Sequence, residues 1–180
     1  MTATAHGKII LLGEHAVVYG ADALAASLSP GADCEARASA EETVLTVAPW
    51  GSSFRPGDGT ELGRAVGQLC ESIGSGDAAL SLTLHLPGGG GVGSSAAMGV
   101  ACARALAELQ GRTLGDAELL GYALDWERVF HGNPSGVDHT LAAIGGVGLF
   151  SRSEGFRRVP TRGALRLCVG DSGELSLIHI

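Results

Sequence analysis

The chain has 180 residues, of which 45% are hydrophobic, and a formal net charge of −7 at pH 7. This length predicts one domain that can bury a real core, and the acidic charge argues against nucleic acid or an anionic membrane as a partner. No apolar run approaches the roughly 20 residues of a membrane span, and the N-terminus lacks the basic and apolar regions of a signal peptide. We expect a cytoplasmic protein with buried thiols, because no C-x-x-C metal pair occurs among Cys34, Cys70, Cys102 and Cys168.

The first predicted strand is the apolar segment Gly7–Gly13, which carries Lys8, the only lysine in the chain. All other residues among the 12 lysines and arginines are Arg, which hints that a compact ammonium group is needed at this position. Because there is only one lysine, its position is also compatible with chance. Glu14 and His15 follow, between the apolar runs IILL and AVV. We expect Lys8, Glu14 and His15 to be partly buried and paired, with solvated surface as the alternative.

The next part of the chain is predicted to be mostly antiparallel β, with strands at Leu24–Ser29, Cys34–Ala38 and Thr43–Val47. Pro30–Asp33 is typical of a turn between the first two strands. Trp50–Thr60 is rich in glycine, proline and polar residues, which predicts a loop. The helical spacing of apolar residues then predicts an amphipathic helix over Glu61–Ile73.

Leu80–Gln110 is the segment around which the rest of the chain is organised, and it predicts a strand, a glycine loop and a helix. Leucines alternate with polar residues along the strand, and Pro87 ends it because proline has no N–H for a ladder. The five glycines that follow leave the backbone free of Cβ atoms, and Ser94 and Ser95 suit the N-cap of an Ala-rich helix. Unpaired N–H groups at the positive end of a helix predict a phosphate-binding site.

Other glycine-rich motifs fit this loop less well. A Walker A loop requires a lysine, which is absent here. Gly88, Gly90 and Gly93 do match the Rossmann pattern G-x-G-x-x-G. However, the acidic residue expected about 20 residues later would be Glu108, within the helix, and another helical pattern follows instead of a strand. A Rossmann dinucleotide-binding unit is therefore a less favoured alternative for this segment, and a flexible linker is less favoured still.

A further helix is predicted to begin near Thr113–Asp116 and to run to about His131. The segment Glu127–Asp138, ERVFHGNPSGVD, then contains an irregular turn forced by two glycines and a proline. Glu127 and Asp138 can therefore point into one place, where two carboxylates near a phosphate loop suit Mg²⁺ ligation and proton abstraction. A solvated helix charge at Glu127 and a helix N-cap at Asp138 are the alternatives.

The segments GKIILLGEHAVVYG, LPGGGGVGSSAAM and ERVFHGNPSGVDHTLAAIGG resemble the first two signature motifs and the GNPSG-D segment of the mevalonate kinase family, in the GHMP kinase superfamily. The resemblance covers residues 5–172 in matching order and spacing. Galactokinase, homoserine kinase, phosphomevalonate kinase and mevalonate diphosphate decarboxylase carry different versions of these segments. The fold class implied is α+β, the GHMP kinase N-terminal domain (ribosomal protein S5 domain 2-like), with a mixed sheet packed with helices.

The resemblance implies transfer of the γ-phosphoryl group of ATP to the C5 hydroxyl of the small-molecule substrate (R)-mevalonate. Asp138 matches the family's catalytic base. Lys8 matches the lysine beside it, which would keep Asp138 ionised and offset charge on the transferring phosphoryl group. Glu14 and His15 match positions that contact mevalonate or support its pocket, and Lys8 and Asp138 would contact the substrate as well.

ATP and Mg²⁺ are the cofactors that the resemblance implies. Glu127 matches the family's acidic Mg²⁺ ligand, and Ser95 matches its hydroxyl ligand. Position 98 is Met, where some family members have an aromatic residue near the nucleotide, so the resemblance assigns it no role. The ATP triphosphate would be held by Pro87, Gly89, Gly90, Gly91, Val92, Gly93, Ser94, Ser95 and Ala96.

The family's third glycine-rich motif, in a C-terminal GHMP domain, has no counterpart in this sequence. We therefore expect residues 1–174 to be the N-terminal ATP- and substrate-binding domain of a homodimeric kinase, and the chain alone to be poorly active. Leu165–Ser172 is predicted to be a strand that enters the missing domain. Leu175–Ile180, LSLIHI, reads like a translated DNA-library adapter, which predicts a non-native tail, with a natural apolar terminus as the alternative.

Overall fold

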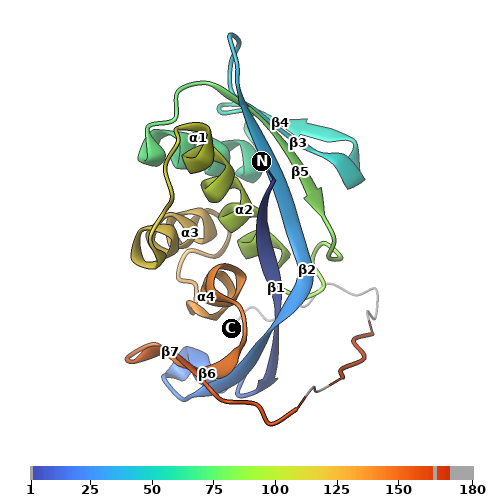
Figure 1. Cartoon of the computed structure of the whole chain (residues 1–180), viewed down its shortest axis with the longest axis vertical. Helices are drawn as coiled ribbons and strands as arrows, with labels where there is room; N and C mark the ends of the chain where they lie inside the picture. Colours follow the sequence, from blue (N-terminus) through green and yellow to red (C-terminus); the bar gives the residue numbers. More distant parts are fainter. Residues whose placement is uncertain (1, 164–165, 171–180) are drawn as a thin grey trace.

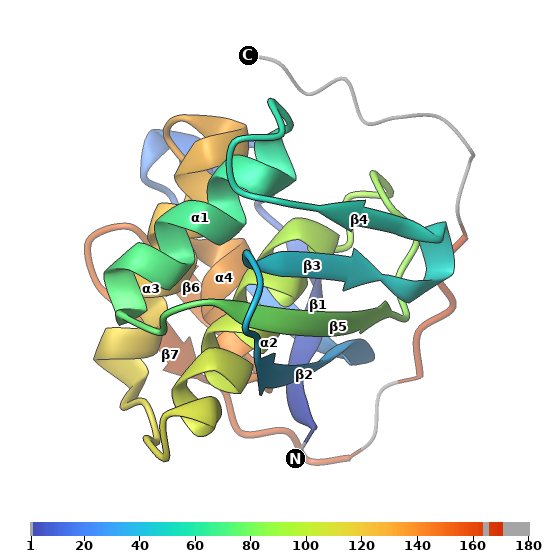
Figure 2. The same cartoon turned by 90° about the horizontal axis from the view of Figure 1, so that it is seen from above.

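The structure is a computed structural model that describes residues 2–163 and 166–170. In this part of the chain, a seven-stranded mixed sheet has α-helices on one face, as Figures 1 and 2 show. The predicted α+β class is therefore confirmed. The strands are β1 (Ala3–Leu12), β2 (Ala23–Ala38), β3 (Val44–Val47), β4 (Ser52–Phe54), β5 (Ala78–Leu84), β6 (Val147–Ser151) and β7 (Gly155–Arg158). The helices are α1 (Glu61–Ile73), α2 (Ser94–Leu109), α3 (Asp116–His131) and α4 (Val137–Ile144), with short 3-10 helices η1 (Ala16–Tyr19) and η2 (Ala48–Trp50).

The long strand β2 connects the two halves of the sheet. The antiparallel strand β1 pairs with it along one side. On the other side, β5 pairs with its C-terminal half and β6 with its N-terminal half, both antiparallel. Strand order is therefore β4-β3-β5-β2-β6-β7, with β1 beside β2. This arrangement brings Lys8 on β1 close to segments that lie far away in the sequence.

The sequence predicted two strands separated by a turn at Pro30–Asp33, and this prediction is wrong. One strand of 16 residues runs through Pro30. The pairing of β1 with β2 shifts register between Ala5 and Gly7, so Pro30 lies outside the regular ladders on both sides of the strand. A proline that is not required to donate an N–H is compatible with a strand, which explains why no turn forms.

The segment between β3 and β5 is more structured than the sequence predicted. Strand β3 pairs antiparallel with β4 and parallel with β5. The predicted loop Trp50–Thr60 therefore contains the end of η2 and all of β4. The predicted helix Glu61–Ile73 is confirmed as α1, and the Thr60 hydroxyl caps it by accepting a hydrogen bond from the Gly63 N–H at 2.9 Å.

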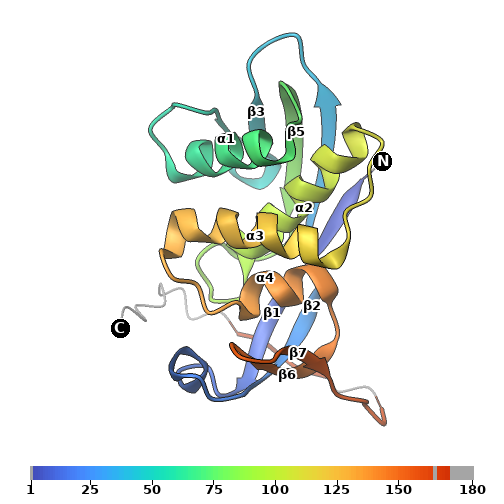
Figure 3. The same ribbon diagram turned by 90° about the vertical axis from the view of Figure 1, so that its left-hand side faces the viewer.

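Helix α2 is the buried centre of the helical layer, with α1, α3 and α4 around it (Figure 3). Its small residues allow close packing against the sheet and against α3. At Gly99, for example, a Cβ atom would lie 2.5 Å from Cγ of Trp126 on α3. This close approach fixes the distance between α3 and the N-terminal half of α2, where the glycine loop ends.

A smaller apolar cluster holds η1 and the start of α4 against the sheet. It consists of Val17, Ala23, Ala25, Val137, Leu141 and Phe150.

No helix among the described residues is both long and apolar enough to cross a membrane. Cys34 and Cys102 are buried, Cys70 is partly buried and Cys168 is exposed, so the expectation of buried thiols is wrong for Cys168 and only partly met at Cys70.

The sequence predicted a strand and a non-native tail at the C-terminal end. Residues 166–170, within the predicted strand Leu165–Ser172, form no regular secondary structure. Residues 165, 171 and 172 of that predicted strand, and the predicted tail Leu175–Ile180, lie outside the described part of the chain.

Candidate active site

The glycine loop connects β5 to α2, as the sequence predicted. Gly89, Gly91 and Gly93 have φ angles of 76°, 69° and 76°. Residues other than glycine rarely adopt this left-handed region of the backbone. The first intrahelical bond joins the Ala97 N–H to the Gly93 oxygen, so the preceding N–H groups are available to an anion. The N-cap is Gly93, and neither predicted serine serves as the cap.

Strand β1 holds the glycine loop in place. The Lys8 backbone N–H donates a hydrogen bond to the Val92 oxygen at 2.9 Å. The Lys8 ammonium donates a second one to the Gly91 oxygen at 2.8 Å. A Cβ atom at Gly93 would lie 2.9 Å from Lys8 Cγ, so a glycine is required where the loop passes over this side chain.

Lys8 also forms an ion pair with Asp138, whose side chain is in the first turn of α4. Nζ of Lys8 lies 3.1 Å from Oδ1 of Asp138. The Lys8 side chain is only 7% exposed, whereas that of Asp138 is 33% exposed. The expectation that Lys8 is buried and paired is therefore confirmed. The pair presents a carboxylate to solvent beside the glycine loop.

Glu127 is the second acidic residue of the site, and it is almost completely buried. Its Oε1 accepts a hydrogen bond from the Ser95 hydroxyl at 2.6 Å, and its side chain is 2% exposed. Burial raises the pKa of this carboxyl from 4.5 to about 7, with a smaller contribution from Asp138, while Ser95 and Lys8 act in the opposite direction. The alternative of a solvated helix charge at Glu127 is excluded.

The Ser95 hydroxyl and the Glu127 carboxylate suit Mg²⁺. Both supply hard oxygen atoms, they converge at the end of the phosphate loop, and Mg²⁺ is commonly held by one or two carboxylates with substrate phosphates and water. The described residues contain no cluster of three or more His, Cys, Asp or Glu that could hold a metal without such help. The donor set therefore fits a metal that arrives with a phosphate ligand.

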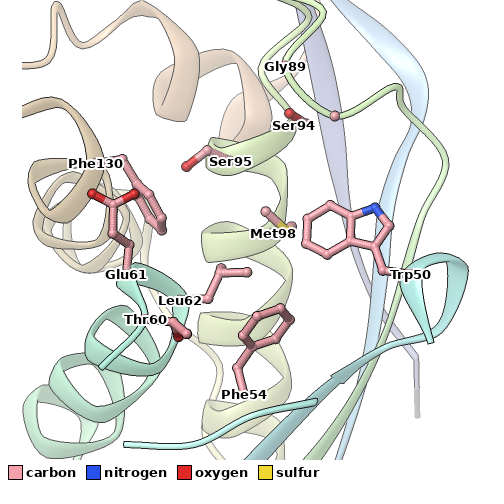
Figure 4. A pocket seen from close by; sticks show the side chains of 11 residues that line it. Trp50, Phe54, Thr60, Glu61, Leu62, Gly89, Ser94, Ser95, Met98 and Phe130 are labelled. Atoms are coloured by element: carbon pink, nitrogen blue, oxygen red, sulfur yellow. The ribbon is translucent and has the colours of Figure 1, made fainter. Parts of the chain in front are cut away.

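A cavity of about 350 Å³ lies beside the loop, and sequence analysis did not find it (Figure 4). Its walls come from η2, β4, α1, α2 and α3. Aromatic rings face it from three of these elements, and the unassigned Met98 lines it too. No local pattern marks such residues, because the pocket forms only when the elements pack. The lining residues are Trp50, Phe54, Thr60, Glu61, Leu62, Gly88, Gly89, Ser94, Ser95, Met98 and Phe130.

In the described part of the chain, Glu14 and His15 are neither buried nor paired, contrary to the sequence prediction. Both side chains are exposed, and neither takes part in a hydrogen bond or ion pair within the described residues. They lie between β1 and η1, where the chain turns at the edge of the sheet and contributes only Val17 to the core. Val17 belongs to the same apolar cluster as Val137, which precedes Asp138 in the sequence.

The glycine loop, the buried acid beside it and the lysine–aspartate pair together form a candidate phosphate-binding site. Residues 61–146 match the family described as GHMP kinases N terminal domain. This part of the chain belongs to that family.

Its relatives include mevalonate kinases. The chain is 31% identical to that of Aeropyrum pernix over 184 residues, which cover 95% of this chain and 57% of the relative. The structure of Methanococcus jannaschii mevalonate kinase matches with a TM-score of 0.77 at 21% identity, over 89% of this chain and 56% of the other. That of L. major mevalonate kinase in complex with R-mevalonate has a TM-score of 0.71 at 32% identity, over 88% and 52%. The chain thus spans about half the length of the curated relatives it matches.

Proposed function

We propose that this chain forms the nucleotide- and substrate-binding domain of a kinase that phosphorylates the C5 hydroxyl of (R)-mevalonate with ATP. The proposal is supported by similarity to mevalonate kinases, one of them solved with R-mevalonate. It is also supported by a site that holds a phosphate loop, a candidate base and a candidate metal ligand within one domain.

The observation that carries the proposal is the double contact of the Lys8 ammonium. It lies 2.8 Å from the Gly91 oxygen of the loop and 3.1 Å from Asp138. A carboxylate is thereby held next to the place where a bound triphosphate would end. Asp138 accepts the proton of the acceptor hydroxyl while the hydroxyl oxygen attacks the γ-phosphorus, and the bond to the bridging oxygen of ADP breaks. Lys8 offsets the negative charge that gathers on the transferring group.

The nucleotide would occupy the loop and the adjoining cavity. The free N–H groups at the start of α2 and the backbone of Gly89–Ser94 bind the phosphates. The aromatic rings of Trp50, Phe54 and Phe130 line a cavity of about 350 Å³, where a flat adenine ring can stack on apolar surface.

Ser95 and Glu127 would hold Mg²⁺ at the junction of the loop and the helix. When bound, Mg²⁺ neutralises charge on the phosphate oxygens and so favours transfer. Glu127 contributes a full negative charge only when deprotonated, and its raised pKa makes that state depend on pH near 7.

A substrate panel tests the proposal. Release of ADP from ATP and Mg²⁺ is measured with (R)-mevalonate, 5-phosphomevalonate, galactose or homoserine as acceptor, and mevalonate is expected to give the highest kcat/KM. Preference for another acceptor would identify a different GHMP kinase. Since the chain spans about half the length of its relatives, ATP and mevalonate binding are measured by calorimetry in parallel. Failure to bind ATP would contradict the proposal.

A further inference from the structure

Four residues in the last two turns of α3 contact the start of α2 or lie beside the groups that do. The Trp126 Nε1–H donates a hydrogen bond to the Ser95 carbonyl oxygen at 3.0 Å. Glu127 accepts from the Ser95 hydroxyl, and Phe130 lines the cavity. One turn after Glu127, His131 faces the same carboxylate. The end of α3 therefore holds Ser95 and Glu127 in a defined arrangement.

The two oxygens of Glu127 have different neighbours. Oε1 accepts from Ser95 at 2.6 Å. Oε2 faces Nε2 of His131 at 3.9 Å, which is longer than a hydrogen bond but which a small rotation of the exposed ring would shorten to one. The His131 side chain is 55% exposed while that of Glu127 is 2% exposed. His131 therefore lies between the buried carboxylate and solvent.

We propose that His131 is a positioning residue for the candidate metal ligand Glu127. By engaging Oε2, the imidazole leaves Oε1 directed toward Ser95 and keeps the carboxylate from turning or from being hydrated. This role requires only an N–H at Nε2, which both the neutral Nε2 tautomer and the charged ring supply. Partners that orient a metal ligand typically change metal affinity by about 10–100-fold when removed.

The exposure of His131 argues against a merely structural role. A side chain that is half in solvent contributes little to the core, and its nearest aromatic neighbour is Phe130, with ring centroids 6.4 Å apart. Its polar contact with the described residues is the one with Glu127. Arg128 offers a matched comparison, because it is also a basic residue in the last turn of α3 and 56% exposed, but it pairs with Asp125.

The inference rests on the proposed function, and Mn²⁺ binding tests the two separately. Free Mn²⁺ is titrated by electron paramagnetic resonance in the presence of ATP, with the unchanged chain and with His131→Ala, His131→Gln and Arg128→Ala. We expect His131→Ala to weaken Mn²⁺ binding about 10-fold or more, at unchanged melting temperature and unchanged affinity for metal-free ATP. His131→Gln places an amide N–H near the position of Nε2 and should restore most of the affinity, while Arg128→Ala should match the unchanged chain.

Each other outcome overturns the inference in a recognisable way. Equal Mn²⁺ affinity in His131→Ala, or an equal loss in Arg128→Ala, would show that His131 does not act on Glu127. An equal loss of metal-free ATP binding would make His131 a direct nucleotide contact. If the unchanged chain binds ATP and Mn²⁺, these results leave the proposed function intact. If it binds neither, the proposed function fails and the role of His131 fails with it.

Discussion

Nζ of Lys8 lies 3.1 Å from Oδ1 of Asp138, although Lys8 belongs to the first strand and Asp138 to the last helix. The same ammonium reaches the Gly91 oxygen. Three segments that are remote in sequence, β1, the glycine loop and α4, therefore meet at one buried side chain. This junction is where the proposed transfer takes place.

Replacement of Asp138 by Asn should abolish most phosphoryl transfer while sparing ATP binding. The amide cannot take a proton from the acceptor hydroxyl, so kcat should fall by roughly 10²–10⁴-fold. The partly exposed position of Asp138 limits the effect on folding. Single-turnover phosphorylation of mevalonate measures the first quantity and calorimetry with ATP the second.

Asp125→Asn is the matched control, because Asp125 is a carboxylate on α3 that pairs with Arg128 at the surface. It should leave transfer unchanged. Retention of full turnover by Asp138→Asn would show that Asp138 is not the base.

Glu127 should make the protein less stable as pH rises from about 4.5 to 7. In the unfolded chain this carboxyl loses its proton near its ordinary pKa of 4.5, whereas burial keeps it protonated up to about 7 in the folded state. The folded state binds more protons in this window, so the free energy of unfolding falls as pH rises, by up to about 3 kcal/mol.

Urea unfolding at pH 5, 6, 7 and 8 measures this slope. Glu127→Gln removes the titrating group and should flatten the profile, whereas Glu71→Gln, at an exposed position of α1, should not. Identical profiles for the unchanged chain and Glu127→Gln would contradict the raised pKa.

Gly93→Ala should destabilise the fold and displace the Lys8 side chain. Gly93 has a φ of 76°, and the new Cβ would lie 2.9 Å from Lys8 Cγ. The backbone conformation alone costs an alanine roughly 1–2 kcal/mol, and the contact adds to that cost.

Gly91→Ala separates the two effects, since Gly91 has a φ of 69° but nothing within 4 Å of the added atom. The melting temperature of Gly93→Ala should therefore be lower than that of Gly91→Ala. The reverse order would mean that the Lys8 side chain moves away from the new Cβ without any loss of stability.

Trp50→Ala should weaken ATP binding but not the binding of inorganic tripolyphosphate. Trp50 is 42% exposed and lines the cavity beside the loop. Loss of one aromatic platform under a base typically costs about 1–3 kcal/mol, which affects only ligands that carry a base. Competition binding with both ligands distinguishes them, and equal losses would place the adenine elsewhere. Quenching of Trp50 fluorescence by ATP gives an independent reading.

Local features of the sequence were enough to predict several elements and the phosphate loop. The bounds Glu61–Ile73 were predicted correctly because an amphipathic repeat contains its own periodicity. The glycines before Ser94 were similarly informative, since positive φ angles near an anion site select glycine whatever the rest of the fold does. The lone lysine and the irregular turn singled out Lys8, Glu127 and Asp138, and resemblance to a known family then implied their roles.

Other predictions failed where distant partners decide the outcome. Pro30 indicates a turn when only its neighbours are considered, but a register shift in β1 accommodates it within β2. Glu14 and His15 appeared buried between apolar runs, yet the second run forms the 3-10 helix η1, of which only Val17 is buried.

By itself, the sequence determined the strand–loop–helix unit, the α1 helix and the residue types available for phosphate and metal chemistry. Only the tertiary structure decided that Lys8 reaches Asp138, that Glu127 is buried against Ser95, and that an aromatic cavity adjoins the loop. The physical reason is that propensity, periodicity and glycine conformation act over a few residues. Burial, charge pairing and cavities depend on which remote segments pack together.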